Sequence, residues 1–236
     1  MSFDAVFFDV GNTLIHPYPS VAEVCSEILV AAGHTYPVAD IEAVLPIVDD
    51  YYEDRYREDD TFWTSDEGAA DVWVGMYSLL CSRLGLPDEQ APVLARAVYD
   101  AFGSSQRWRA YADVAPAFER LRAAGTAVGI ISNWDSRLAS ILGGLGLGGL
   151  IDTIVCSAAD GLHKPDPRIF ELACARVGFP ASRCAHIGDH MYADVIGART
   201  AGLTPVLIDR FDASIPDSGD PVVRIVTLDD LEGALG

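Results

Sequence analysis

Residues 5–13 read AVFFDVGNT, an apolar run of strand type that ends in a carboxylate, Asp9. In parallel α/β sheets ligands bind at the carboxyl ends of the strands, so Asp9 is placed for chemistry. Gly11 and Asn12 follow, and these residue types form tight turns with exposed backbone amides. The segment predicts a parallel sheet whose first strand delivers an acidic side chain to a ligand site.

Two later apolar runs end in polar residues in the same way. Residues 128–131 lead to Ser132 and Asn133, and the run AHIG leads to Asp189, with Asp194 five residues further on. Two carboxylates at that spacing can lie near one cation. We therefore expect the three strand ends to contribute to one site.

Lys164, in the run HKPDPRIF, is the single lysine of the chain, and fifteen arginines supply the other basic side chains. A lysine ammonium is a compact point charge on a flexible stem, which suits a crowded anionic site better than a planar guanidinium. The alternative is chance survival of one lysine in an arginine-rich composition. The three acidic and polar strand ends favour the first interpretation.

Alternating strand and helix patterns from Asp113 onward predict a parallel sheet with helices on both faces. Strands are expected at 126–131, 153–156, 184–187, 204–208 and 222–226. Helices are expected at 113–124, 136–143, 167–177, 191–201 and the C-terminus. Residues 212–221, rich in Asp, Ser, Gly and Pro, are expected to form an exposed connector.

Residues 17–108 interrupt that pattern with helical stretches alone, expected at 20–32, 38–57, 66–84 and 88–102. Aromatic and arginine side chains of this part are candidates for lining a pocket, although such residues more often pack between helices. These candidates are Tyr51, Tyr52, Arg55, Tyr56, Arg57, Phe62, Trp63 and Trp73. The acidic residues that alternate with the arginines here are expected to form a solvated face.

The pieces DVGNT, SN, KP and GDHMYAD stand in the order of the four motifs of the haloacid dehalogenase superfamily, which this chain resembles. Residues 128–210 resemble more narrowly the rhythmically-expressed-gene type, whose substrates are poorly defined. The resemblance implies a Rossmann-like, doubly wound α/β core, formed by residues 1–16 and 109–236. It also implies an inserted all-helical cap domain, residues 17–108, which would exclude water and select the substrate.

The resemblance further implies a hydrolase, most simply a phosphatase that transfers phosphate to an aspartate. Asp9 would be the nucleophile, Ser132 would hydrogen-bond a phosphate oxygen, and Lys164 would balance the negative charge. A carboxylate is a poor nucleophile toward a dianionic ester, so a cofactor Mg²⁺ is implied. Its oxygen ligands would be Asp9, Asp189, Asp194 and the backbone carbonyl of Gly11. The expected phosphate-binding residues are Gly11, Asn12, Thr13 and Asn133.

Gly11 departs from the phosphatase pattern, which usually has a second Asp at this position. That carboxylate protonates the leaving oxygen and then activates water, a contribution of roughly 10² to 10⁴ in rate. We therefore expect weak hydrolysis of alkyl phosphates and a smaller loss for activated esters. The candidate replacements are His16, His163, Asp135 and His190.

Three other functions stand against a phosphatase, and the second of them is nearly excluded. The dehalogenases of the superfamily also lack the second Asp and attack carbon without a metal, but their pattern places Tyr before the Gly and lacks the acidic pair. Phosphonate hydrolases use a lysine of the cap, and residues 17–108 contain none. The third is a binding or regulatory protein that keeps the fold and the metal without turnover.

The net charge of −19 argues against a nucleic-acid partner, because phosphates repel such a surface. No apolar run is long enough to span a membrane and no export signal is apparent, so we expect a cytoplasmic enzyme with a small-molecule substrate. The five cysteines lack metal-ligand spacing and are expected to be reduced core residues. The oligomeric state stays open.

Overall fold

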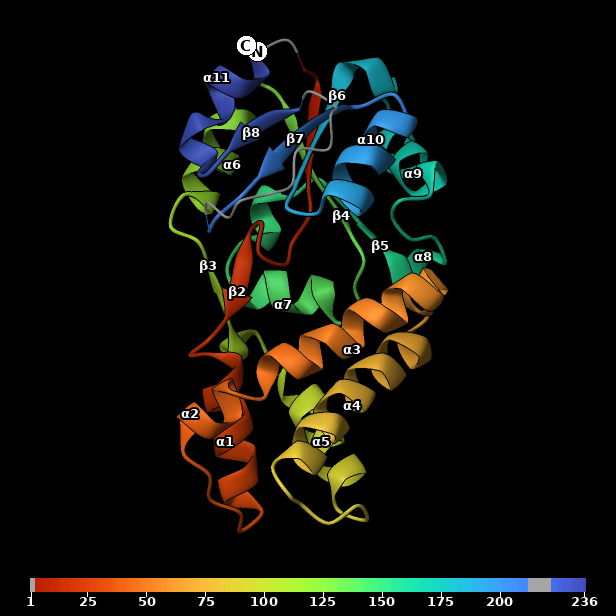
Figure 1. Ribbon diagram of the computed structural model, residues 1–236. Helices are drawn as coiled ribbons and strands as arrows, with labels where there is room; N and C mark the ends of the chain where they lie inside the picture. Colours follow the sequence, from red (N-terminus) through yellow and green to blue (C-terminus); the bar gives the residue numbers. More distant parts are fainter. Residues whose placement is uncertain (1–2, 212–221) are drawn as a thin grey trace.

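A six-stranded parallel sheet with the order β5-β4-β1-β6-β7-β8 forms the centre of the computed structural model, which describes residues 3–211 and 222–236 (Figure 1). All four residues of β1 are buried, as in a parallel strand covered on both faces. The strands are β1(Ala5–Phe8), β4(Ala127–Ser132), β5(Thr153–Cys156), β6(Cys184–Gly188), β7(Thr204–Ile208) and β8(Val223–Ile225). The predicted Rossmann-like α/β core is confirmed, and the connector expected at 212–221 lies outside the described residues.

Side-chain alternation along β1 divides the core into two layers. Val6 and Phe8 pack on one face of the sheet, and the ring of Phe8 lies 5.0 Å from that of Phe118. Ala5 and Phe7 pack on the other face. The first face is covered by α6(Val114–Ala123), α7(Leu138–Gly144) and α11(Leu231–Leu235), and the second by α9(Pro167–Val177) and α10(Gly197–Thr200).

Neighbouring strands bring the sequence motifs together at one edge of the sheet. Phe8 of β1 pairs with Ile130 of β4 on one side and with Ile187 of β6 on the other. Asp9 therefore lies between the ends of the strands that precede Asn133 and Asp189. The shared edge that the sequence predicted for these motifs is present.

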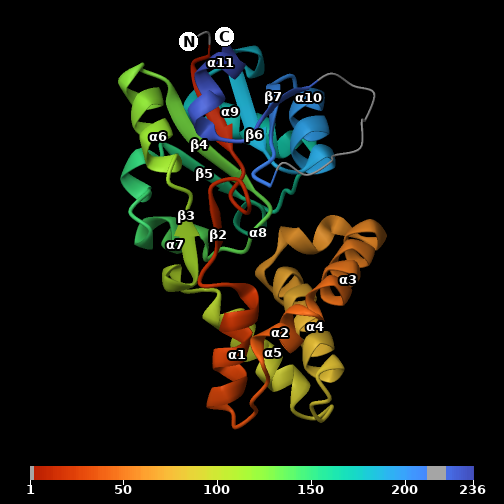
Figure 2. The same ribbon diagram turned by 60° about the vertical axis from the view of Figure 1, so that its left-hand side comes forward.

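A helical insert lies beyond this edge, at the end of the molecule opposite both termini (Figures 1 and 2). Its helices bury a hydrophobic cluster of their own. They are α1(Val21–Ala31), α2(Val38–Glu42), α3(Leu45–Glu58), α4(Asp66–Arg83) and α5(Ala91–Ala101). The single helix expected at 38–57 is wrong: Pro46 fits only the first turn of a helix, so the chain starts α3 anew there.

A two-stranded antiparallel ribbon joins the insert to the sheet. It consists of β2(Ile15–Pro17) and β3(Trp108–Ala110), with Pro17 opposite Trp108. The sequence did not reveal these strands because each has only three residues. The ribbon lies at both expected domain boundaries, and the division into two domains stays a prediction.

The helix expected at 191–201 differs most in form from its prediction. A π-helical turn, η5(Met191–Ile196), comes first, and α10 follows. In this wider turn the carboxylate of Asp194 accepts the backbone N–H of His190 at 3.0 Å. Such turns are rare and often occur at functional sites. The remaining short helices are α8(Ser157–Asp160), η1(Asp60–Thr64), η2(Ser105–Arg107), η3(Gly148–Leu150), η4(Ala181–Arg183) and η6(Leu228–Asp230).

Among the described residues, no helix combines the length and apolar character that a bilayer crossing needs. All five cysteines are buried and unpaired, as expected of reduced core residues.

Candidate functional site

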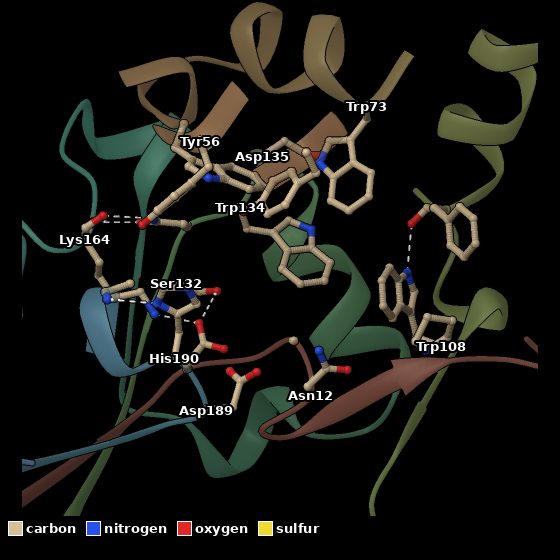
Figure 3. A pocket seen from close by; sticks show the side chains of 18 of the residues that line it. Asn12, Tyr56, Trp73, Trp108, Ser132, Trp134, Asp135, Lys164, Asp189 and His190 are labelled. Carbon is tan, nitrogen blue, oxygen red and sulfur yellow. Dashed lines mark hydrogen bonds and ion pairs between the residues drawn. The ribbon is translucent and has the colours of Figure 1, made fainter. Parts of the chain in front are cut away.

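Asp9 is held in place by two donors at the end of β1. Its Oδ1 accepts the hydroxyl of Ser132 at 2.9 Å and the ammonium of Lys164 at 2.6 Å (Figure 3). Asp9 is only 8% exposed, so these two contacts replace much of the hydration of its carboxylate. Three residues from distant parts of the chain thus form one hydrogen-bonded group.

Lys164 is 2% exposed and bridges two carboxylates, with its Nζ 2.6 Å from Asp9 Oδ1 and 2.6 Å from Asp194 Oδ1. Burial by itself disfavours the ammonium, but Asp194 and Asp9 together raise the pKa of Lys164 above its usual value. The side chain is therefore charged. A buried ammonium between two carboxylates depends on both of them.

The side chain of Asn133 fixes the backbone of Lys164. Its Oδ1 accepts the Lys164 N–H at 2.7 Å, and its Nδ2 donates to the Lys164 carbonyl at 3.0 Å. This reciprocal pair connects the loop after β4 to the loop that carries the lysine. The Asn133 side chain therefore positions Lys164, and the phosphate contact expected of this residue would have to come from its backbone amide.

Asp9, Asp189 and Asp194 form what we call the carboxylate trio, because one oxygen of each lies within 4.8 Å of the others. Burial, together with the charges of Asp9 and Asp194, raises the pKa of Asp189 to about 8. Burial also opposes ionisation of Asp194, but Lys164 and His186 hold its pKa well below the usual value. One ammonium thus faces three carboxylates, an excess of negative charge that favours a bound cation or a proton.

The oxygens of the trio suit Mg²⁺, which prefers hard carboxylate ligands. The expected fourth ligand, the carbonyl of Gly11, accepts the N–H of Thr13 at 2.6 Å. A carbonyl has two lone pairs, so one is left for another partner. The donor set therefore fits the expected metal ion.

His186 supports Asp194 from beneath, and the sequence analysis missed it. The ring is fully buried on β6, and its Nε2 lies 2.8 Å from Asp194 Oδ1. A polar residue inside an apolar strand, two positions before the Gly-Asp pair, was the available signal. Gly188 is also required, because a Cβ there would lie 2.2 Å from the carboxyl carbon of Asp194.

Two residues expected to bind phosphate lie in the turn after β1. The N–H of Asn12 donates to the carbonyl of Ile15 at 2.9 Å, and Asn12 has a positive φ of 53°. Thr13 is fully buried, and its hydroxyl donates to Asp189 Oδ1 at 3.3 Å. The Thr13 hydroxyl and the Asn12 N–H thus already have partners within the protein, and Asn12 borders the cavity. Phosphate binding by these two residues stays a prediction.

A cavity of about 470 Å³ opens from Asp9 toward the helical insert. Figure 3 places Asp189 and Asn12 on one side of it and Tyr56 and Trp73 on the other. Of the pocket candidates from the sequence, four line this cavity: Tyr52, Tyr56, Trp63 and Trp73. The sequence analysis missed further aromatic lining, namely Tyr77, Tyr99, Phe102, Trp108 and Trp134.

The other pocket candidates lie elsewhere. Tyr51 and Phe62 pack against the hydrophobic cluster of the insert. Arg55 pairs with Glu58 at 3.0 Å and Arg57 with Asp54 at 3.4 Å, all on an exposed face. Of the acidic residues expected on a solvated face, Asp54, Glu58 and Asp59 are exposed, whereas Asp60 is half-buried and Glu53 is half-buried and lines the cavity.

The four candidates for an acid or base divide into two groups. The described lining of the cavity includes His190 and Asp135 but neither His16 nor His163. Asp135 is held by Arg137 at 2.6 Å. In His190, Nδ1 accepts the N–H of Ala193 at 3.1 Å, so the neutral ring carries its proton on Nε2. His190 is thus the candidate with a proton to donate.

Comparison with known proteins assigns the chain to a family. Residues 3–202 match the haloacid dehalogenase-like hydrolase family. Haloacid dehalogenase-like hydrolase domain-containing protein 3 of Danio rerio is 29% identical over 233 residues, which cover 98% of this chain and 95% of the relative. Glyceraldehyde 3-phosphate phosphatase of Methanopyrus kandleri is 30% identical over 212 residues, which cover 87% and 84%.

Solved structures agree with the fold. The HAD-hydrolase YfnB from Bacillus subtilis, bound to magnesium, has a TM-score of 0.81 at 18% identity, with 100% of both chains covered. Other matches include both phosphatases and 2-haloacid dehalogenases. The chain belongs to the haloacid dehalogenase-like hydrolase family.

Proposed function

We propose that this hydrolase is a Mg²⁺-dependent phosphatase that acts on a small phosphorylated molecule through a phosphorylated Asp9. The carboxylate trio beside Lys164 is the observation that carries the proposal. A reaction at carbon needs no cation between nucleophile and substrate, whereas a dianionic phosphate can approach Asp9 only if charge is neutralised. The phosphatase relatives support the same reaction class.

In the first step Asp9 attacks phosphorus, the bond to the leaving oxygen breaks, and the phosphoryl group is carried on Asp9. In the second step water attacks phosphorus, which releases inorganic phosphate and restores the carboxylate. Ser132 and Lys164 already donate to Asp9 Oδ1, so both lie where they can donate to phosphoryl oxygens. Mg²⁺ held by the carboxylate trio would supply charge neutralisation and polarise the phosphoryl group.

The leaving oxygen and the attacking water each need a proton donor or acceptor, and Gly11 supplies neither. His190 is the residue we assign to this task, because it lines the cavity and its neutral ring carries the proton on Nε2. His190 is exposed, so its ring is held less firmly than a buried side chain, and we expect it to be a weaker catalyst than the carboxylate usual at position 11. The helical insert would act as the cap that covers the site.

Hydrolysis of p-nitrophenyl phosphate by the purified protein, with Mg²⁺ and with EDTA, tests the proposal. Activity that requires both Mg²⁺ and Asp9, judged with Asp9→Asn, is the expected result. Release of halide from 2-chloropropionate without Mg²⁺ would instead establish the dehalogenase reaction. Binding of Mg²⁺ and phosphate without turnover of either substrate would establish a binding protein.

A further inference from the structure

Six aromatic rings form a continuous series around the cavity, which we call the aromatic arc. Successive ring centroids are 6.1, 6.2, 6.1, 5.5 and 5.0 Å apart. Its members are, in order, Tyr52, Trp73, Tyr77, Phe102, Trp108 and Trp134. They come from α3, α4, the end of α5, β3 and the loop after β4, and all six line the cavity. Such a wall offers faces and edges of rings to the organic part of a substrate.

The last ring of the arc lies beside Gly11. A Cβ at Gly11 would lie 3.4 Å from the ring of Trp134, which is ordinary contact. The Trp134 backbone N–H is held by Ser157 Oγ at 3.0 Å, and its ring meets that of Trp108 at 62°. Aromatic surface therefore stands next to the position from which a carboxylate would protonate the leaving oxygen.

The cavity has no cation to spare for a second anionic group. Among its described lining residues, the lysine and arginine side chains are Lys164 and Arg137. Lys164 is taken by Asp9 and Asp194. Arg137 donates to both oxygens of Asp135, at 2.8 and 2.6 Å, and to the carbonyl of Tyr99 at 2.9 Å. A substrate with a carboxylate or a second phosphate would bury a charge without a partner, which is costly.

Leaving-group chemistry leads to the same class of substrate. Without a strong acid at position 11, the leaving oxygen has to depart with little protonation. A phenol ionises near a pKa of about 10, as tyrosine does, whereas an alkanol is a much weaker acid. A phenolate therefore departs more readily from phosphorus than an alkoxide does. Both the ring-lined wall and the missing acid suit an aromatic leaving group.

We propose that the substrate class of this site is the aryl phosphate monoester, a phosphate on the hydroxyl of an aromatic ring system that carries no second anionic group. This inference rests on the proposed phosphatase function. The bond from phosphorus to the aryl oxygen breaks as Asp9 bonds to phosphorus. The phenolate leaves with the electron pair and takes a proton from water or from His190.

The test compares kcat/KM, with Mg²⁺, for phenyl phosphate, 4-carboxyphenyl phosphate and ethyl phosphate. We expect phenyl phosphate to exceed ethyl phosphate by about 100-fold or more, the size of a general-acid contribution. We also expect it to exceed the carboxylated ester by about 10-fold, the cost of an unpaired anion. Equal kcat/KM for the phenyl and ethyl esters would overturn the inference and leave the phosphatase function standing. Hydrolysis of no ester would overturn both.

Trp73→Leu and Trp134→Leu test the wall itself. Each should raise KM for phenyl phosphate by about 10-fold, the value of a lost ring contact with its buried area, and change KM for ethyl phosphate by less than about 2-fold. Tyr36→Leu is the matched control, because Tyr36 packs against the hydrophobic cluster of the same insert without lining the cavity, and its kinetics should be unchanged. A thermal melt identifies any variant that fails to fold. Equal effects of the two tryptophan variants on both esters would contradict a role in selecting the ring.

Discussion

The wall of the cavity at the sheet edge carries buried charges, whereas the wall from the insert and β3 carries aromatic rings. At the edge, Lys164 and Asp194 are 2% and 1% exposed, and the Lys164 ammonium makes two charged hydrogen bonds of 2.6 Å, to Asp9 and Asp194. On the other wall Trp73 and Trp108 are half-buried and pack against neighbouring rings, and Trp108 also donates its indole N–H to the Phe102 carbonyl at 2.8 Å. The first wall is suited to act on one phosphoryl group. Substitutions on the aromatic wall should instead change which substrate binds, while the phosphoryl transfer at the charged wall is kept.

The difference predicts a steep contrast between substitutions on the two walls. Asp9→Asn should lower kcat for p-nitrophenyl phosphate by roughly 10⁴-fold, because the nucleophile is lost while its shape is kept. The variant should remain folded, and circular dichroism gives the check. If Asp9→Asn retained more than a tenth of the wild-type activity, Asp9 would not be the nucleophile.

Lys164→Met should be the most destabilising change at the edge. It leaves Asp9 and Asp194 buried without their shared ammonium, which we expect to cost about 3 to 5 kcal/mol in the free energy of unfolding. Urea unfolding monitored by fluorescence measures this cost. Arg168→Ala is the control: its ion pair with Asp166 is exposed, and such pairs contribute about 0 to 1 kcal/mol. If Lys164→Met and Arg168→Ala lowered the free energy of unfolding by similar amounts, the Lys164 ammonium would not be needed to stabilise the fold.

Gly11→Asp tests both walls at once, because it adds a carboxylate at the charged wall that would lie against the ring of Trp134. The backbone accepts a Cβ there at 3.4 Å from the ring, so the variant should fold. We expect turnover of ethyl phosphate to rise about 10- to 100-fold and that of phenyl phosphate to change much less, since a phenolate needs little protonation. A rise of equal size for both esters would mean that leaving-group protonation does not separate them.

The pH dependence of the metal-free protein should reveal the strain within the carboxylate trio. Because the pKa of Asp189 is raised from 3.8 to about 8, the folded protein holds a proton there that the unfolded chain releases. This carboxyl therefore contributes a loss of stability as the pH rises from about 4 to about 8. Asp189→Asn removes that contribution, so its stability relative to wild type should grow across this window and level off above it.

Urea midpoints in EDTA at about pH 5 and about pH 8 measure the difference between the two proteins. Saturating Mg²⁺ at the higher pH should reverse the order, because only wild type keeps the complete trio. Parallel pH profiles for the two proteins in EDTA would contradict a strained carboxylate at position 189.

The charged wall could be predicted from the sequence because it depends on strand ends. The runs before Asp9, Ser132 and Asp189 are short and apolar, and parallel pairing alone brings their ends together. Lys164 was visible as the single lysine of the chain. The sequence could not show that the Asn12 N–H bonds the Ile15 carbonyl, that the Thr13 hydroxyl bonds Asp189, or that His186 bonds Asp194. Each of these depends on which way one side chain or N–H points.

The aromatic wall could not be predicted because no local pattern marks it. Tyr52 and Phe62 lie within eleven residues and are equally aromatic, yet Tyr52 lines the cavity and Phe62 packs within the insert. Trp108 reaches the cavity only because β3 pairs with β2, two strands too short to recognise. Trp134 directly follows Ser132 and Asn133, and nothing in the local sequence indicates that its ring lines the cavity. The π-helical turn at Met191–Ile196 also has no local mark, whereas the break before Pro46 follows from the proline itself and could have been predicted.

The most direct test of the central claim is to look for phosphate on Asp9 itself. The protein is mixed with a radiolabelled aryl phosphate and Mg²⁺, quenched in acid within the first turnover, and digested for peptide mapping. We expect label on the peptide that contains Asp9, removed by hydroxylamine and absent from Asp9→Asn. Release of labelled inorganic phosphate with no label on that peptide at any quench time would contradict this claim.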